Sequence, residues 1–170
     1  NRYIEHEGFV SERFAKNAFQ ITEAERAILI DTSDFRVYEP QLGLTGARTA
    51  YFHKTLGGYH GAKPRRFEEL FEYYNTHQIA GVLDFLNVKY ILFQEEETAT
   101  LKPLRNPNAL GSSWFVEDLF STPDPDALLE RLKIADFDKE ALFIEQDLPN
   151  TLPLSFKKDS LAWIVLTSKK

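Results

Sequence analysis

Two helical repeats that run straight into an almost wholly apolar segment constrain the fold of this chain most strongly. Apolar residues recur at three- and four-residue spacing over 67–74 and again over 79–86, which predicts two amphipathic helices. Pro64 fits the first turn of the first helix, and Asn87 suits the end of the second. Residues 88–93 are typical of a central strand buried on both faces. A helical pair beside a buried strand indicates a sheet with helices packed against it.

Shorter signals extend this alternation in both directions. The capping box at Thr22–Glu25 predicts a short helix to about Leu29, and Pro123–Asp126 opens another helix that passes through Leu132. The predicted strands comprise residues 35–38, one beginning at 114–116, 141–144 and 161–167. The predicted fold is therefore α/β or α+β, a single domain in which helices cover a mixed β-sheet. We assign residues 1–160 to this domain, and the strand within 161–170 either completes it or begins a following domain.

Composition excludes several classes of protein and site. The chain has 170 residues, enough for one domain with a substantial core, and its net charge of −6 argues against nucleic acid as a partner. It has no cysteine, which excludes disulfides, zinc–thiolate sites and thiol nucleophiles. No apolar run is long enough to span a membrane, and no signal peptide is recognisable. Since the sequence also lacks methionine, Asn1 is not a natural start, and we expect a piece of a longer protein.

Residues 51–67, here called the basic–aromatic segment, carry the strongest functional signal. They combine three glycines, two histidines and four cations with several aromatic rings. Lys63, Arg65 and Arg66 lie at the start of a predicted helix, where the helix dipole makes each exposed cation unfavourable by roughly 0.3–1 kcal/mol. An anion held between these cations and the free N–H groups of the first turn would reverse that cost. The segment therefore predicts an anion-binding surface.

A structural interpretation of the same residues stands beside the functional one. Glu68, Glu69 or a distant carboxylate would neutralise the cations, and the glycines would only form turns. The glycine spacing matches neither a P-loop nor a dinucleotide-binding turn, so no nucleotide site is predicted.

The histidines and aromatic rings of the segment are candidates for other roles. His53 and His60 are candidate metal ligands or proton-transfer groups, although their spacing matches no known ligand pattern. Tyr51, Tyr59 and Phe67 are candidates for stacking on a sugar ring or for packing beneath the segment. The predicted ligand-binding residues are Tyr59, His60, Lys63, Arg65 and Arg66.

No catalytic residue, metal or cofactor is predicted. A glycosidase needs two carboxylates set across a cleft, and the sequence singles out no such pair. The acidic run at 95–97 indicates a solvated surface, and Asp124 and Asp126 belong to the start of a helix. Ser/His/Asp catalysis is not supported, because the chain has no G-x-S-x-G turn.

Segments at 35–38, 51–67, 82–92 and 106–116 occur in an order and spacing that resemble the YfhO family of polytopic bacterial membrane proteins, particularly the versions in Bacteroidetes. The similarity extends over roughly residues 20 to 145. It implies a large protein with many transmembrane helices in a GT-C-like arrangement and a soluble domain on the exoplasmic, periplasmic side of the inner membrane. Such proteins are linked to the transfer of sugars from polyprenyl-phosphate carriers onto cell-envelope polymers such as teichoic acids.

The resemblance also implies what this domain does not do. In GT-C enzymes the catalytic carboxylate lies in a loop between early membrane helices, so we expect the present chain to be non-catalytic by itself. One interpretation is a domain that positions a polyprenyl-phosphate sugar donor or an envelope-glycan acceptor. Another is a structural domain that braces the transmembrane part of the same polypeptide and has no ligand of its own. A free-standing enzyme is the least favoured interpretation.

Overall fold

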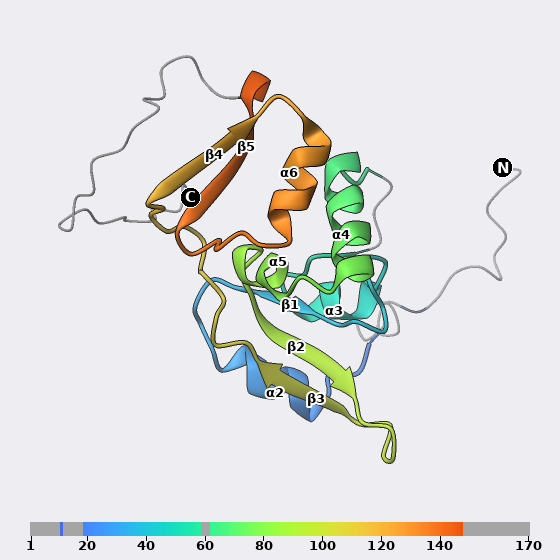
Figure 1. The fold of residues 1–170 in the computed structure, drawn as a ribbon. Coiled ribbons are helices and arrows are strands. Elements are labelled where there is room, and N and C mark those ends of the chain that lie inside the picture. The colour runs from blue at the N-terminus through green and yellow to red at the C-terminus, as the bar shows by residue number, and fades with distance from the viewer. Residues whose placement is uncertain (1–10, 12–18, 59–61, 148–170) are drawn as a thin grey trace, which may run out of the picture.

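A three-stranded mixed sheet forms the centre of the molecule (Figure 1). The structure, a computed structural model, describes residue 11 and residues 19–58 and 62–147. Across the sheet the strands are β1 (Arg36–Tyr38), β2 (Val88–Gln94) and β3 (Leu101–Arg105). β2 pairs in parallel with β1 and antiparallel with β3, which makes it the central strand that the sequence predicts.

Helices cover both faces of this sheet. α2 (Glu23–Leu29) packs on one face, while α4 (Arg65–His77) and α5 (Ala80–Phe85) pack on the other. Neighbouring residues of β2 serve the two sides, because Ile91 faces the α4–α5 core and Leu92 faces α2. The buried residues of the larger core, on the α4–α5 side, are Tyr38, Leu56, Phe71, Val82, Leu83, Leu86 and Val88.

The first half of the basic–aromatic segment is hydrogen-bonded to the central sheet. It begins in α3 (Ala47–Phe52), after which the N–H of Val37 in β1 donates to the carbonyl of Lys54 at 2.8 Å. Gly57 then lies against the backbone of Leu44, where an added Cβ would approach the Leu44 Cα to 2.7 Å. This glycine is therefore required by close packing of two chain segments.

A second, two-stranded parallel sheet lies above the first layer in Figure 1. It consists of β4 (Asp118–Thr122) and β5 (Glu140–Ile144), joined by α6 (Pro125–Leu132) and followed by a 3₁₀ turn, η2 (Glu145–Asp147). The Phe137 ring connects this unit to α5, since it lies 4.7 Å from the ring of Phe85. The indole of Trp114 adds to the contact by donating from Nε1 to the Phe137 carbonyl at 2.8 Å.

The observed fold confirms the predicted class, here α+β with a mixed sheet and packed helices. The capping box forms as expected, with Thr22 and Glu25 bonding reciprocally at the start of α2. Asp124 caps α6, and the helices predicted after Pro64 and before Asn87 are both present. The predicted strand at 161–167 lies outside the described residues.

Several details differ from the predictions. The strand expected to begin at 114–116 begins at Asp118, because its pairing with β5 starts there, opposite Glu140. Trp114 lies ahead of the strand, with its side chain bound to the Phe137 carbonyl. β2 is fully buried only at Val88 and Leu92, and Phe93, on the same face of the strand as Ile91, is 38% exposed. The short elements α3 and β3 were not predicted. In the described part of the chain, no helix is both long and apolar enough to cross a membrane.

Candidate functional site

The start of α4 exposes the cations that the sequence singles out. Pro64 occupies the N-cap position without a side-chain hydrogen bond to the first turn. The side chain of Arg65 is 90% exposed, and its Nε donates to Glu69 Oε1 at 2.7 Å. Arg66 is 77% exposed, and its Nη1 lies 2.8 Å from Asp147 Oδ2 in η2. The carboxylate partner foreseen at Glu69 is thus present for Arg65, while Arg66 is paired by a residue distant in sequence.

These pairs are weak enough to exchange with a ligand. Both partners of each pair are substantially exposed, and solvent-exposed ion pairs contribute only about 0–1 kcal/mol. An anion with more charge than a carboxylate would compete for the same guanidinium groups. Both arginines at the start of α4 are therefore paired, but by contacts that an anion can displace.

A mostly apolar groove of about 790 Å³ lies directly beside this cationic surface. It runs between α4, α6 and β5, and Arg66 is one of its lining residues. The groove is large enough for a drug-sized ligand. Its main apolar lining residues are Leu70, Phe85, Leu128, Leu129, Leu142 and Ile144. The carboxylates Glu69, Asp126 and Glu140 also line the groove, and Glu69 and Glu140 are paired with Arg65 and Arg131. With its anionic end at Arg66, an amphipathic ligand therefore suits the groove better than a small inorganic anion.

The other predicted residues fall in different places. Tyr59 and His60 lie outside the described residues, and Lys63 is half-buried ahead of α4. Phe67 packs against the α4–α5 core, with its ring stacked 6.2 Å from that of Phe71, so it serves packing. Tyr51 is half exposed and contacts the Phe19 ring edge-on at 5.5 Å.

His53 occupies an environment that favours its neutral form. Its Nε2 is buried and has no hydrogen-bond partner among the residues that the structure describes. Burial lowers the pKa of His53, the charge of Glu25 opposes that shift, and Arg48 reinforces it. The described ranges contain no group of three His, Asp or Glu side chains placed to hold a metal ion, and His60 lies outside them.

A buried ion cluster on the opposite face of the sheet was not predicted. We define it as Glu25 of α2, Glu39 at the end of β1, and Arg48 and Thr49 of α3. Arg48 lies between the two carboxylates, with Nη1 2.8 Å from Glu25 Oε1 and Nη2 3.2 Å from Glu39 Oε2. Thr49 also donates its hydroxyl to Glu39 Oε2, at 2.5 Å. The side-chain exposures of Glu25, Glu39 and Arg48 are 0%, 8% and 22%.

Helix capping fixes the orientation of this cluster. Glu25 Oε2 accepts hydrogen bonds from the Thr22 backbone N–H at 2.7 Å and from its hydroxyl at 3.0 Å. That leaves Oε1 directed at Arg48. Glu25, Glu39 and Arg48 each contact two other residues of the chain or of the cluster, and these contacts restrict their rotamers.

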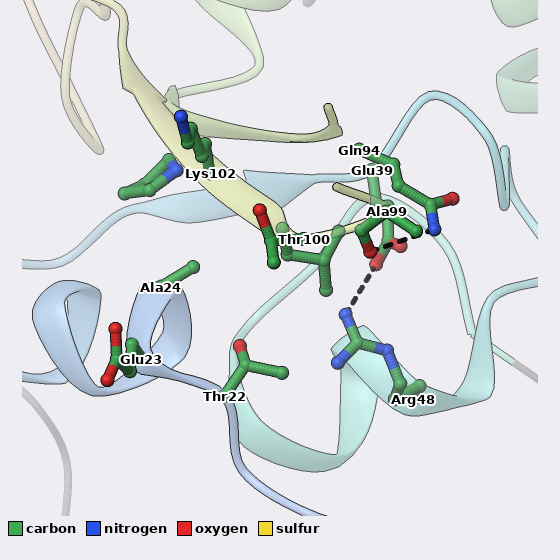
Figure 2. Close-up of a pocket in the computed structure, with 11 residues that line it drawn as sticks. Thr22, Glu23, Ala24, Glu39, Arg48, Gln94, Ala99, Thr100 and Lys102 are labelled. Atoms are coloured by element: carbon green, nitrogen blue, oxygen red, sulfur yellow. Dashed lines mark hydrogen bonds and ion pairs between the residues drawn. The ribbon is translucent and has the colours of Figure 1, made fainter. Parts of the chain in front are cut away.

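The ion cluster opens into a pocket of about 790 Å³, which Figure 2 shows in close-up. The pocket lies between the start of α2, the end of β1, α3 and the β2–β3 hairpin. The guanidinium of Arg48 reaches toward Glu39 from one side, and the Gln94 amide, bonded to the Ala99 carbonyl, lies next to them. Glu23 and Lys102 lie at the other end of the view.

Sequence reasoning missed this pocket because its residues carry no local pattern. Glu25 was recognised only as a cap, and Glu39 and Arg48 belong to segments with no motif. One signal was present: Glu25 adjoins Ala24 and precedes Ile28, both buried, so it lies toward the apolar side of its helix. A carboxylate in that position indicates a buried partner.

The resemblance noted in the sequence stays a prediction. Comparison with known proteins finds no matching family model, no matching curated protein and no matching solved structure.

Proposed function

We propose that this chain is a non-catalytic extracytoplasmic domain of a polytopic membrane protein resembling a GT-C-type glycosyltransferase of cell-envelope glycan biogenesis. In this proposal the start of α4 and the adjoining groove contact a polyprenyl-phosphate sugar donor. The observation that carries the proposal is the position of Arg66, an exposed cation that lines a mostly apolar groove.

The phosphate would bind at the cationic surface. Arg65 and Arg66 occupy the first turn of α4, whose N–H groups and dipole favour an anion. A guanidinium can bind two phosphate oxygens at once, which the exposed pairing with Asp147 does not prevent. Lys63, one residue before the helix cap, adds a third positive charge.

The groove would receive the apolar part of the same ligand. Its leucine and isoleucine side chains are partly exposed, and covering them removes apolar surface from water at about 25 cal/mol per Å². A branched hydrocarbon next to a phosphate is the chemistry of a polyprenyl phosphate. The non-catalytic part of the proposal rests on the resemblance, which places the catalytic carboxylate in the membrane part of the protein.

The same groove supports a second candidate function, a domain that braces the transmembrane helices. In that case an apolar segment of the membrane part would occupy the groove, and the cations at its side would have no ligand. The two candidate functions differ in whether they require the positive charges at the start of α4. A lipid phosphate needs Arg65 and Arg66, whereas an apolar helix needs only Leu128, Leu129 and their neighbours.

Charge reversal in the full-length membrane protein distinguishes the two candidates. We expect the triple variant Lys63→Glu, Arg65→Glu, Arg66→Glu to accumulate normally in the membrane and to lose most of its sugar transfer. A matched control reverses three exposed cations elsewhere, Arg26, Arg105 and Lys139. The control changes the net charge equally and should leave transfer intact.

Two results would count against phosphate positioning. Sugar transfer that persists in the triple variant would show that these cations are not needed. A triple variant that fails to accumulate, while the control accumulates, would favour the bracing function.

A further inference from the structure

The pocket beside the buried ion cluster is lined by charged side chains that the fold holds in fixed positions. Glu39 is nine-tenths buried and lines the pocket, and both of its hydrogen bonds within the described residues go to Oε2. Its second oxygen, Oε1, therefore has an acceptor position that remains for a ligand. Arg48 lies at the same place. Within the described residues its Nη2 donates to Glu39 and its Nη1 lies at ion-pair distance from Glu25, so others of its five N–H donors remain for a ligand.

We propose that this pocket binds a neutral polyhydroxyl ligand, of the carbohydrate class, through Glu39 and Arg48. The inference goes beyond the proposed function and does not rest on the start of α4. Figure 1 places α2, which borders the pocket, on the far side of the central sheet from α4.

The pairing of donor and acceptor selects hydroxyl groups. A hydroxyl both donates and accepts, so two neighbouring hydroxyls can donate to Glu39 Oε1 and accept from Arg48 at the same time. Both protein groups are fixed beforehand, since Thr49 and Glu25 hold them from behind. The side chains do not have to be ordered upon binding, which lowers the cost of binding.

The charges of the pocket disfavour ions as ligands. Its lining contains two acidic residues, Glu23 and Glu39, and two basic residues, Arg48 and Lys102. An amine would approach Glu39 only by lying next to the Arg48 guanidinium, 3.2 Å from that carboxylate. A phosphate would meet the Glu39 carboxylate in the same way. A neutral polyol encounters no such repulsion.

The remaining wall suits the non-polar parts of a sugar. Ala24, Ala99, Leu101 and Pro103 supply apolar surface, and Thr22, Gln94 and Thr100 supply further polar groups. The volume of about 790 Å³ lies within the range for small-molecule sites.

The test is an NMR titration of the whole chain with neutral methyl glycosides of glucose, galactose and N-acetylglucosamine at millimolar concentrations. We expect at least one to give saturable shifts of the amides at Glu39, Arg48 and Thr100. Glu39→Gln should weaken that binding about tenfold or more, since hydrogen bonds to a charged group are worth roughly 1.5–3 kcal/mol.

A second pair of variants keeps the ion cluster intact. Thr100→Trp places a bulky ring on the exposed wall of the pocket and should abolish binding without changing the fold. Glu97→Trp places the same ring on the same hairpin but at an exposed position outside the pocket lining, and should bind as the unaltered chain does. Methylamine and inorganic phosphate serve as charged probes in parallel titrations.

Three outcomes would overturn the proposal. They are the absence of a saturable shift with all three glycosides, equal binding by the Thr100→Trp and Glu97→Trp variants, and Glu39-dependent binding of methylamine or phosphate in place of the glycosides. None of them bears on the groove beside α4, so the proposed function would be unaffected.

Discussion

Two arginine–carboxylate clusters in this molecule have the same chemistry and opposite environments. Arg48 is 22% exposed and lies between two carboxylates that are almost fully buried. Arg66 is 77% exposed and pairs with a carboxylate in the 3₁₀ turn after β5. A buried pair cannot be opened without leaving a charge in a medium that solvates it poorly, whereas an exposed pair is readily replaced by water or by a ligand. Burial therefore keeps Arg48 bound to Glu25 and Glu39, whereas Arg66 can exchange its carboxylate for a ligand.

Removing the buried guanidinium should have the largest effect. Arg48→Gln leaves Glu25 and Glu39 facing each other without a cation, and breaking a buried pair in this way costs about 3–5 kcal/mol. Urea unfolding followed by circular dichroism measures the loss. Arg26→Gln, on the exposed side of α2, is the control and should cost little. A loss below about 1 kcal/mol for Arg48→Gln would remove the contrast between the two clusters.

The next effect tests what the glycines of the basic–aromatic segment do. The Cβ of a Gly57→Ala variant would lie 2.7 Å from two Leu44 backbone atoms, so one chain segment must shift. We expect a loss of about 1–3 kcal/mol in the free energy of unfolding, as for other overpacked sites. If the variant unfolds at the same urea concentration as the parent, Gly57 is not a packing residue. Close approach of a ligand would then become the better explanation for it.

Loss of the α2 cap should have an intermediate effect. Thr22→Ala removes the hydroxyl that caps α2 by accepting from the Glu25 N–H, and with it the hydroxyl's hydrogen bond to Glu25 Oε2. We expect a cost of about 0.5–2 kcal/mol. Thr22→Ser retains the hydroxyl and should restore most of the stability. Equal destabilisation by both variants would mean that the hydroxyl does not support the cluster.

The exposed arginine should give the smallest change in stability. Arg66→Gln removes its pair with Asp147, and we expect a loss of no more than about 1 kcal/mol, which added salt should reduce further. This substitution matches Arg48→Gln in chemistry, so the difference between the two unfolding free energies measures the effect of burial. A loss at Arg66 as large as that at Arg48 would contradict the comparison.

The dependence of stability on pH tests the burial of His53. The pKa of His53 is lowered by burial, so the unfolded chain binds this proton more tightly than the folded one does. The contribution of His53 to stability is complete above its ordinary pKa of about 6.5 and is lost as the pH falls below that value. His53→Gln should reduce the slope of stability against pH in that window, and His77→Gln, at the exposed end of α4, should not remove it. A slope unchanged by His53→Gln would refute this assignment.

The contrast also explains what could be predicted from the sequence. Local signals identified α2 through its capping box, α6 through Asp124 and β2 through its apolar run, because each signal lies within the element it forms. β3 was missed because Pro103 interrupts it, a residue that an edge strand tolerates. α3 has only six residues, too few to establish a helical period.

The residues of the candidate sites also separate into those with a local sequence pattern and those brought together only by folding. Arg65 and Arg66 were recognisable because adjacent cations at a helix start are a local pattern. The partner of Arg66 was not recognisable, since Asp147 is 81 positions away. Glu25, Glu39 and Arg48 meet only when α2, β1 and α3 pack together, so no pattern within one segment indicates their contact.

The most direct test of the central claim is an NMR titration of the chain with farnesyl phosphate, a short soluble prenyl phosphate. It follows the Nε–Hε signals of Arg66 and Arg48 and the methyl signals of Leu129 in the same samples. We predict saturable shifts at Arg66 and Leu129, an unchanged Arg48 signal, and weaker binding by inorganic phosphate. No saturable shift at Arg66, or binding that is unaltered in the Arg65→Glu, Arg66→Glu variant, would contradict the claim that this exposed cluster receives a phosphate-linked lipid.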